Sequence, residues 1–369
     1  MFLRFLLLVS LLALAPAAPA GDPTAEQGPV RVVIVGLTHD HVFWLLGRPR
    51  DRGDLEIVGV YEPDLDLARR RMEGAGLPMN LHATDLESLL DRTEPDAAVL
   101  FGSIHEHHEQ TLACVAAGAH VMVEKPLATN LAHAREMAEA AERAGVHLLT
   151  NYETTWYPSV WETHRRVSEG RIGEVRRMVF RMGHRGPVEI GCRPAFLNWL
   201  LDPQENGAGA LTDFGCYGVN LASWLMESAR PRSVTCITQQ TRPDTYPRVD
   251  DDATILLEFD NAVAVIQASW AWPLSVKETR VFGQRGELLT LGSDGLRTAL
   301  PREPIEVREN LPRPDSLEDD PFAHLAAVVR GDRDPNALSA VENNLLVVEV
   351  LDAARRSAET GERVELPQP

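Results

Sequence analysis

Short apolar segments alternate with helix-forming segments over residues 29–150, and this alternation limits the possible folds more than any other feature of the chain. Val30–Val35 is rich in β-branched residues and ends at Gly36, and Leu55–Tyr61 ends at Glu62. Strands of a parallel sheet have this pattern because both of their faces are buried. Further strands are predicted over 97–101, 120–123 and 146–150, with helices over 67–74, 85–91, 108–117 and 130–144. The sequence therefore predicts a doubly wound α/β domain, which binds ligands at the carboxyl ends of its strands.

The pattern changes after residue 150, where strand-forming segments predominate. Helices are predicted over 158–169, 215–226 and 339–360, and strands over 174–183, 234–240, 253–259, 262–270, 278–282 and 287–291. Asp260-Asn261 and Gly283–Gly286 are typical of the tight turns that join strands into hairpins. We therefore expect residues 151–366 to form an α+β domain with a largely antiparallel sheet, for substrate binding and oligomer contacts.

The first twenty residues have the features of a secretory signal peptide. Arg4 is their only charge, an apolar run covers Phe5–Ala15, and Ala18-Pro19-Ala20 provides a cleavage site. A retained membrane anchor is the weaker interpretation, because the run is shorter than the roughly 20 residues that a spanning helix needs. The sequence thus predicts a signal peptide over residues 1–20 and a mature protein that is periplasmic or secreted.

The acidic composition limits the possible partners. The chain has 36 Lys+Arg against 54 Asp+Glu, a formal net charge of −18, and no basic stripe that would follow a phosphate backbone. No second apolar run is long enough to span a membrane. These features argue against nucleic acid and membrane as partners and favour a neutral or weakly charged small molecule.

The positions of the cysteines and histidines do not define a metal site. The cysteines match neither zinc-ligand spacing nor a disulfide framework, and we expect buried thiols with one optional, unassigned disulfide: Cys114, Cys192, Cys216 and Cys236. Two groups of histidines follow neighbouring strands and could together bind a transition metal: His39 and His41, and His105, His107 and His108. No carboxylate or cysteine at ligand spacing completes a metal motif. We therefore predict no metal and assign these histidines to phosphate, ribose or solvent.

The turn after the first strand, Gly36-Leu37-Thr38-His39-Asp40-His41, is a candidate dinucleotide site. A dinucleotide fingerprint has three glycines in the pattern G-x-G-x-x-G, and only Gly36 is present here. Glu62, at the end of the second strand, supports the assignment because its carboxylate can accept both ribose hydroxyls and would repel a 2′-phosphate. The alternative is that a sheet of this kind simply ends its strands with polar residues.

A second candidate is Glu124-Lys125-Pro126, directly after the strand over 120–123. A lysine at the carboxyl end of a central strand lies in the functional crevice, and Pro126 fixes the turn that presents it. The ammonium of Lys125 could hydrogen-bond a substrate hydroxyl and position a general base, or donate a proton if desolvation lowers its pKa. The alternative is a surface ion pair between Glu124 and Lys125.

A third candidate is the glycine-rich segment Gly207–Asn220. Its small residues let the backbone approach a ligand closely, and the helix that begins around Asp213 places Asp213, Tyr217 and Asn220 on one face. The alternative makes Asp213 a helix N-cap and Tyr217 a half-buried core aromatic. Further candidates for contact with a sugar, of which the aromatic residues could equally be core, are Trp156, Tyr157, Arg193, Trp199 and Asp202.

These motifs together resemble the Gfo/Idh/MocA oxidoreductases, the family of glucose-fructose oxidoreductase and inositol dehydrogenase. Glu124-Lys125-Pro126, after Gly118-Ala119-His120-Val121, is similar to the E-K-P signature of that family, and His108 stands at the spacing used before the signature. Gly170-Arg171-Ile172-Gly173-Glu174-Val175 resembles its G-x-I-G-E-V segment, and Gly207–Asn220 resembles its G-G-G-x-L-x-D-x-G-x-H-x-x-D motif. The likeness extends over about residues 30–366.

The resemblance implies a Rossmann domain joined to an open-faced mixed-sheet domain, a nicotinamide cofactor, and a sugar or cyclitol substrate. The predicted export adds that the cofactor is tightly held, because free dinucleotide is scarce outside the cytoplasm. It places Lys125 beside the reacting hydroxyl and gives Tyr217 the acid–base role, as a phenolate stabilised by that lysine. Asp213, also counted as catalytic, and Asn220 would orient Tyr217 or the substrate. Cofactor contacts, with NAD favoured over NADP, are assigned to Gly36, Thr38, His39, Glu62, Ser103, His105, His108, Glu124 and Lys125. Substrate contacts are assigned to Lys125, Tyr217, Asn220, Trp156, Trp199, Asp202 and Arg193.

Departures from the family pattern leave three functions open. Tyr217 and Asn220 stand where many members have His and Asp, and Thr38 and His39 lie where the backbone should approach the pyrophosphate, so cofactor binding could be altered or lost. The first function is an exported oxidoreductase that transfers hydride between a retained cofactor and a sugar or cyclitol hydroxyl. The others are a cofactor-assisted glycosidase or lyase that acts by transient oxidation and elimination, and a cofactor-free carbohydrate-binding protein on the same fold. An open sheet face also favours a homodimer or tetramer.

Overall fold

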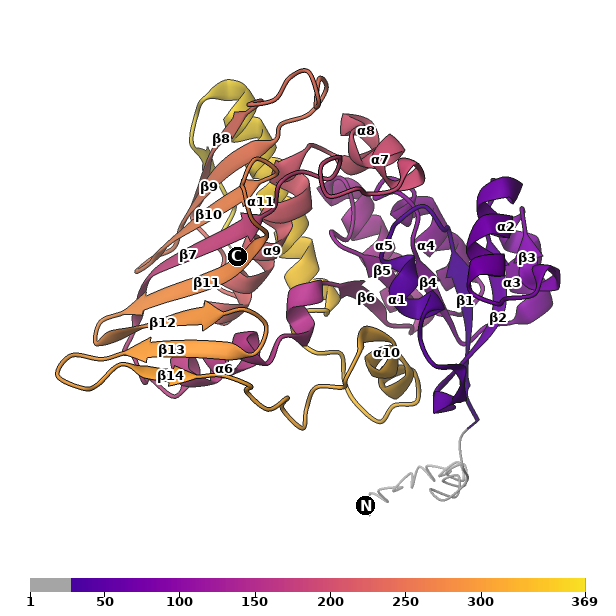
Figure 1. The fold of residues 1–369 in the computed structure, drawn as a ribbon, viewed down its shortest axis with the longest axis horizontal. Coiled ribbons are helices and arrows are strands. Elements are labelled where there is room, and N and C mark those ends of the chain that lie inside the picture. Colours follow the sequence, from indigo (N-terminus) through magenta and orange to yellow (C-terminus); the bar gives the residue numbers. More distant parts are fainter. Residues whose placement is uncertain (1–27, 369) are drawn as a thin grey trace, which may run out of the picture.

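The computed structural model describes residues 28–368, and the predicted signal peptide lies outside the described residues. Two sheets organise these residues into two domains that lie side by side (Figure 1). None of the described helices is long and apolar enough to cross a membrane.

A six-stranded parallel sheet forms the first domain, in the order β3-β2-β1-β4-β5-β6. Its strands are β1 (Val30–Val35), β2 (Leu55–Tyr61), β3 (His82–Ala83), β4 (Ala97–Leu100), β5 (His120–Glu124) and β6 (Leu148–Asn151). Its helices, which build separate cores on the two faces, are α1 (Val42–Leu46), α2 (Leu65–Gly74), α3 (Leu86–Thr93), α4 (His107–Ala116) and α5 (Leu131–Ala144). The strand order reverses between β1 and β4, and this leaves a crevice at the carboxyl ends of the strands. The predicted doubly wound domain is confirmed.

Short polar side chains and a glycine set the ends of these helices. Asp64, Asp85 and Asn130 accept backbone N–H groups at the N-termini of α2, α3 and α5. Gly145 ends α5 in the left-handed conformation. Because these signals are local in the chain, the predicted boundaries lie within about two residues of the observed ones.

A nine-stranded mixed sheet forms the second domain, in the order β14-β13-β12-β11-β7-β10-β9-β8-β15. Its strands are β7 (Val175–Gly183), β8 (Ser233–Gln239), β9 (Asp252–Glu258), β10 (Val263–Ser269), β11 (Val276–Gly283), β12 (Gly286–Leu291), β13 (Gly295–Ala299), β14 (Glu306–Arg308) and β15 (Val364–Glu365). The β7–β10 pair is parallel, and the other pairs of this sheet in the described residues are antiparallel. The prediction of a largely antiparallel α+β domain is confirmed.

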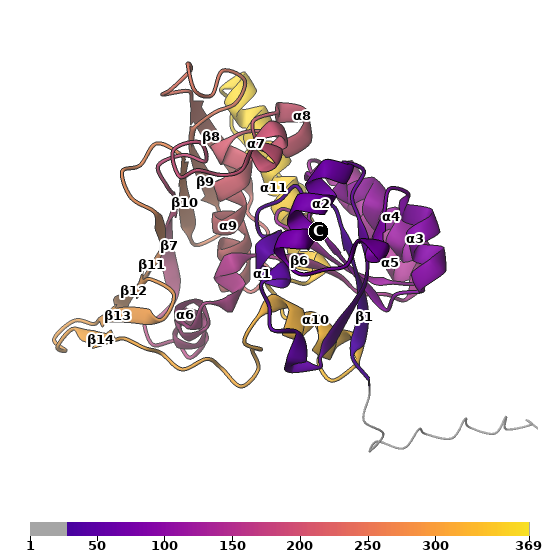
Figure 2. The ribbon, with the colours of Figure 1, turned by 45° about the vertical axis from the view of Figure 1, so that its right-hand side comes forward.

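Helices cover one face of this second sheet. α9 (Ala210–Leu225) and α11 (Val341–Thr360) pack on it, and α11 also contacts α5 and β6 of the first domain. Figure 2 shows the opposite face without a helix in the described part of the chain. Ile237 and Leu256, which alternate with buried residues along β8 and β9, are 65% and 41% exposed. The open-faced sheet expected from the family resemblance is therefore present.

The start of α9 explains the glycine-rich segment. Asp250 accepts the backbone N–H groups of Gly209 and Leu211 at 2.7 Å each, and so satisfies the first turn of the helix from a distant part of the chain. A Cβ atom at Gly209 would lie 1.8 Å from the carbonyl oxygen of Asp250. The close approach predicted for this segment is thus made by the protein's own backbone, and α9 begins at Ala210, earlier than predicted.

Three helices have no clear signal in the sequence: α7 (Pro194–Leu200), α8 (Pro203–Asn206) and α10 (Pro321–Val329). The first two are too short to show a helical period. α10 lies between segments of the second domain, yet Phe322 and Leu325 belong to the apolar core of the first domain. The chain therefore returns to the first domain after building most of the second.

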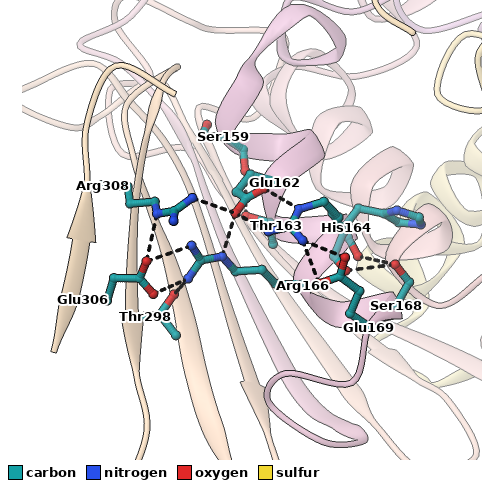
Figure 3. A network of polar contacts seen from close by, with 11 residues as sticks. Ser159, Glu162, Thr163, His164, Arg166, Ser168, Glu169, Thr298, Glu306 and Arg308 are labelled. Carbon is teal, nitrogen blue, oxygen red and sulfur yellow. Dashed lines mark hydrogen bonds and ion pairs between the residues drawn. The ribbon is translucent and has the colours of Figure 1, made fainter. Parts of the chain in front are cut away.

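A polar network fixes α6 (Pro158–Ser168) to the edge of the second sheet (Figure 3). Arg166, which is 5% exposed, donates to Glu162 at 2.8 Å and to Glu306 at 2.8 and 3.2 Å. It also donates to the hydroxyl of Thr298 on β13. Four of the five N–H donors of the Arg166 guanidinium are thus bound by groups of the protein.

Candidate active site

The carboxyl end of β5 meets the start of α9 at the boundary between the two domains. Lys125, which directly follows β5, donates to the Asp213 carboxylate and, at 3.2 Å, to the Asp213 carbonyl oxygen. The indole N–H of Trp270 donates to the other carboxylate oxygen of Asp213 at 2.8 Å. Lys125 and Asp213 are 5% and 7% exposed, so the ion pair is buried. Since an ammonium has three protons, Lys125 keeps one donor for a ligand.

Both members of this pair are charged at neutral pH. Burial alone would raise the pKa of Asp213, but the Lys125 ammonium outweighs it, and the pKa falls to about 2. Burial alone would lower the pKa of Lys125, but Asp213 outweighs this effect and the pKa is raised. Lys125 is therefore a cationic hydrogen-bond donor, and the predicted alternative of a desolvated lysine that gives up its proton is wrong.

Tyr217 lies one helical turn after Asp213 and is 2% exposed. The ammonium nitrogens of Lys125 and Lys277 lie 5.4 and 4.9 Å from the centroid of its ring, where they act as cation–π partners. Burial, followed by the negative charge of Glu153, raises the pKa of Tyr217 well above its ordinary value. The prediction of a lysine-stabilised phenolate is therefore wrong, and Tyr217 carries a neutral hydroxyl.

A second charged pair, which the sequence analysis missed, adjoins Tyr217. Glu153, just after β6, accepts from Lys277 of β11 and from the hydroxyl of Tyr157. Burial alone would raise the pKa of Glu153, but Lys277 outweighs it and the pKa is lowered. Glu153 follows a strand end, as Glu124 does, and the same argument could have found it. Lys277 has no local signal, because only the sheet brings β11 to this position.

Two cavities border this pair. One of about 390 Å³ is lined by Lys277, and one of about 620 Å³ is lined by Trp44 and Trp156. Glu153 and Tyr157 line both cavities, so the two adjoin, and they are called the cleft below. Aromatic walls suit the apolar faces of a sugar ring. Of the predicted substrate residues, Trp156 thus borders the cleft, although it is 8% exposed and its indole N–H donates to Asn151.

The turn after β1 keeps two features of a dinucleotide site. Gly36 has φ = +77°, and a Cβ atom there would lie 2.7 Å from the backbone nitrogen of Gly102, so the position requires glycine. Glu62 lies at the end of β2, where a carboxylate can bind ribose, and accepts the N–H of Leu37 at 2.8 Å. Gly36 and Glu62 therefore fit the adenosine end of NAD.

Three backbone N–H groups of this turn are used within the chain. The N–H of Leu37 is bound by Glu62, that of His39 by the carbonyl oxygen of Phe101 at 2.8 Å, and that of His41 by His39 Nδ1 at 3.0 Å. Dinucleotide turns direct such groups at the pyrophosphate. These three N–H groups, including that of the predicted contact His39, are therefore unavailable to the pyrophosphate of NAD in this conformation. Thr38 is engaged through its hydroxyl, which donates to the carbonyl oxygen of Phe101 at 3.3 Å.

Helix α7 covers the same turn. The rings of Phe196 and Trp199 lie 4.7 and 5.6 Å from the ring of His39, which is 2% exposed. The backbone N–H of Arg193 donates to the Asp40 carboxylate at 3.1 Å. Trp199 and Arg193, both predicted to contact substrate, therefore pack against the first domain instead.

Glu124 connects the turn to the end of β5. Its Oε2 atom lies 2.9 Å from His41 Nδ1, and its Oε1 atom accepts from Asn151 at 2.8 Å. His41 in turn stacks on Trp44 with a centroid distance of 3.8 Å. Burial alone would raise the pKa of Glu124, but His41 outweighs it and the pKa falls to about 2. Glu124 is thus a buried carboxylate, and the alternative of a surface ion pair with Lys125 is wrong.

The histidines predicted to share one end of the crevice form separate groups. His39 and His41 lie 4.5 Å apart by their ring centroids. His105 and His108 instead lie 5.8 and 4.1 Å from His133 of α5. The single five-histidine group is therefore wrong, because the histidines after β4 lie against α5. The four cysteines are free, so the optional disulfide is absent.

Three other predicted site residues are bound within the protein. Asp202 caps the N-terminus of α8. Asn220 donates to the carbonyl oxygen of Leu338 at 2.9 Å, and Ser103 donates to the Glu205 carboxylate at 2.6 Å. Each of these three side chains therefore has a structural role within the protein that requires no ligand.

Because a second domain closes the carboxyl edge of a Rossmann-type sheet with the Lys125–Asp213 pair, the molecule has the architecture of a two-domain nicotinamide-dependent dehydrogenase. The chain belongs to the GFO/IDH/MocA oxidoreductase family. Residues 30–152 match its oxidoreductase domain with an NAD-binding Rossmann fold, and residues 160–289 match its C-terminal domain. The resemblance found in the motifs is confirmed in both domains, and with it membership of an NAD-binding enzyme family.

Named relatives of this chain are dehydrogenases and reductases. It is 28% identical to trans-1,2-dihydrobenzene-1,2-diol dehydrogenase of Xenopus laevis over 63% of this chain and 66% of the relative. It is 24% identical to D-glucoside 3-dehydrogenase of Escherichia coli K12 over 85% and 91%. The crystal structure of an inositol dehydrogenase homolog from Azotobacter vinelandii, complexed with NAD⁺, superposes with a TM-score of 0.79, at 21% identity and over 92% and 98% of the two chains.

Proposed function

We propose that the protein transfers hydride between NAD and a hydroxyl-bearing carbon of a sugar or cyclitol. The observation that carries the proposal is the buried Lys125–Asp213 pair, which leaves one ammonium proton of Lys125 unused at the carboxyl edge of the Rossmann sheet. The printed names of relatives, such as D-glucoside 3-dehydrogenase, support the substrate class. The aromatic cleft walls at Trp44 and Trp156 support it independently.

The charge states of Lys125 and Tyr217 suit the binding of a carbonyl substrate. Lys125 is an ammonium, and Tyr217 is a neutral phenol, so both can donate a hydrogen bond to a carbonyl oxygen. Asp213 positions Lys125, because it binds the ammonium through its carboxylate and its carbonyl oxygen. NAD supplies the hydride chemistry, and Gly36 and Glu62 would hold its adenosine end. Reduction of a keto-sugar therefore requires no prior deprotonation of either residue.

A redox-neutral glycosidase or lyase is a second candidate, favoured by the Glu153–Lys277 pair. A transiently oxidised sugar can eliminate a neighbouring glycosidic substituent if a base removes the acidified proton and an acid assists the leaving group. A carboxylate and an ammonium, Glu153 and Lys277, lie together on the wall of the cleft. This pair has no role in the simple reduction.

Release of the cofactor, followed by turnover, tests the proposal. The purified protein is denatured and the supernatant assayed for NAD by absorbance and mass, and native protein is then supplied with NADH and keto-sugars or with glycosides. Net NADH oxidation that is lost in Lys125→Met supports the oxidoreductase. Glycoside cleavage without net NADH change supports the second candidate. Neither bound nor bindable dinucleotide, together with no turnover, contradicts both and leaves a cofactor-free carbohydrate-binding protein.

We also propose that the chain is exported. The apolar run over Phe5–Ala15 and the site at Ala18-Pro19-Ala20 support cleavage after Ala20. Cell fractionation with mass determination of the mature N-terminus tests this, and an intact Met1 in the cytoplasm contradicts it.

The open sheet face supports a proposed homo-oligomer, either a dimer or a tetramer. Ile237 and Leu256 are large apolar side chains that stand exposed on this face. We expect Ile237→Lys to lower the molar mass measured by light scattering to that of one chain. A wild-type protein that is already monomeric contradicts the proposal.

A further inference from the structure

One cluster of side chains in the first domain combines three groups that bind transition metals. His39, His41 and Glu124 each offer one ligand atom, and these atoms lie within 4.8 Å of one another. His39 is 2% exposed and Glu124 is 2% exposed. Two imidazoles and one carboxylate form the ligand set of catalytic zinc and of non-haem iron(II) sites. The cluster therefore has the composition and the compactness of a metal site.

A metal ion bound by these three residues would replace the hydrogen bonds that now join the residues to one another. His41 Nδ1 and Glu124 Oε2 are 2.9 Å apart, a separation that two ligands of one ion can have. His39 Nδ1 accepts the amide of His41, and His39 Nε2 is buried without a hydrogen-bond partner. Coordination needs the lone pair of one of these nitrogens, so the amide contact must be given up in either case: directly if Nδ1 binds the ion, or because the proton of Nε2 moves to Nδ1 if Nε2 binds it. Metal binding commonly displaces protons in this way.

The surroundings hold the carboxylate ligand in place. Asn151 donates to Glu124 Oε1 at 2.8 Å and itself accepts from the indole of Trp156 at 3.0 Å. Such outer contacts orient metal ligands in known sites. Glu124 Oε1 is thus fixed by β6, while Oε2 faces the histidines.

The cluster also lies in the dinucleotide turn, where three of the backbone N–H groups are not free to bind an anion. His41 stands at the position of the third glycine of the fingerprint, and the N–H groups of Leu37, His39 and His41 are bound within the chain. An ion at this place would supply the positive charge that those groups no longer supply. The loss of the glycines and the gain of ligands therefore have one explanation.

We propose that His39, His41 and Glu124 bind a divalent transition metal ion of the zinc type, with an oxygen donor completing its coordination. Three protein ligands leave at least one position open. The oxygen donor has the chemistry of a pyrophosphate or of vicinal hydroxyls, so it comes either from the dinucleotide or from the sugar. This proposal does not depend on which redox direction, if any, the enzyme catalyses.

Metal titration of the intact mature protein tests the site. After dialysis against a chelator, Zn²⁺ and Co²⁺ are added and bound metal is measured by elemental analysis. We expect one equivalent per chain, with affinity lowered at least about 10- to 100-fold in His41→Ala and in Glu124→Gln. His108→Ala is the matched control, since His108 also lies 2.7 Å from a carboxylate, that of Glu136, and we expect it to bind metal as the wild type does. Wild-type protein without a stoichiometric site, or variants that bind equally well, would overturn the proposal.

The absorption spectrum of bound Co²⁺ gives a readout that needs no variant. A site with imidazole and carboxylate ligands and an open position has ligand-field bands that shift when an oxygen donor binds. A shift on addition of NAD identifies the pyrophosphate as the donor, and a shift on addition of a polyol identifies hydroxyls. A spectrum of hexa-aqua Co²⁺ contradicts the ligand set. A spectrum of the bound ion that neither addition changes contradicts the open position.

Discussion

Arg166 and Lys125 are both 5% exposed, and each joins two distant parts of the chain through carboxylates. Four of the donors of Arg166 are bound by Glu162, Glu306 and Thr298. Lys125 instead binds one carboxylate and keeps a proton without an acceptor. A buried cation that two carboxylates and a hydroxyl surround stabilises the fold, whereas one with a single carboxylate partner and a free donor at the carboxyl edge of the sheet can bind a ligand. The Arg166 network thus contributes to stability and the Lys125 network to ligand binding as well. Substitutions in the two networks should therefore have different effects on unfolding and on activity.

Lys125→Met should have the largest effect, on both stability and activity. The change leaves Asp213 buried without its cation, which costs about 3–5 kcal/mol of unfolding free energy. Removal of the donor should also lower kcat/KM about 10²- to 10³-fold. Lys125→Met with Asp213→Asn should recover much of the stability but none of the activity. Denaturant unfolding and steady-state kinetics measure the two effects, and recovery of activity in the double variant would contradict the assigned role.

Tyr217→Phe should lower activity without a comparable loss of stability. The ring keeps its contacts with Lys125 and Lys277, and only the hydroxyl is removed. Loss of a positioned proton donor lowers kcat about 10²-fold. Tyr152→Phe is the control, because Tyr152 packs edge-on against Tyr217 and its own hydroxyl is buried without a partner. Equal activity losses in the two variants would show a packing effect.

Arg166→Met should lower stability alone. Loss of charge-assisted hydrogen bonds to Glu162 and Glu306 costs about 1–3 kcal/mol. Arg165→Met is the control, since Arg165 pairs with Glu162 and Glu169 on the exposed side of α6 and should change stability by less than about 1 kcal/mol. A fall in kcat/KM for Arg166→Met would contradict the conclusion that the Arg166 network stabilises the fold without contributing to ligand binding.

Acid should weaken both networks in the same pH range. The pKa of Asp213 is about 2 because Lys125 outweighs burial, and the pKa of Glu162 is about 2 because Arg165 binds it. Both values lie below those of the unfolded chain, about 4. Their stabilisation is therefore complete above about pH 4 and is lost as the pH falls toward 2. Unfolding measured between pH 2 and 5 should have a shallower acid slope in Asp213→Asn and Glu162→Gln than in the wild type. An unchanged slope contradicts the pairing.

The first domain, and Lys125 and Asp213 as separate candidates, were accessible from sequence because their signals are local, but the ion pair between the two was not predicted. β1 to β6 are bounded by turn residues, and Lys125 and Asp213 lie in recognisable motifs. α10 was not accessible, because its amphipathic segment packs against the first domain from a position late in the chain.

The charged groups around the site were only partly predictable. The sequence identified His41 and Glu124 as candidate site residues. It did not show that they are in contact, because they lie far apart in the chain. Lys277 reaches Glu153 only through the pairing of β11 with β7. Spacing in the sequence reveals ligands on one turn or helix, but not ligands that meet at the edge of a sheet.

Helices α10 and α11 have a consequence for how ligands are exchanged. α10 contributes to the first core although it follows most of the second domain, and α11 packs on both domains. With the domains joined at so many points, a wide hinge opening would disrupt two apolar cores. Exchange then depends on local segments such as α7, whose Phe196 and Trp199 cover His39. The rate at which α7 moves away from the turn after β1, more than the affinity of that turn for its ligand, would then set how long the ligand stays bound.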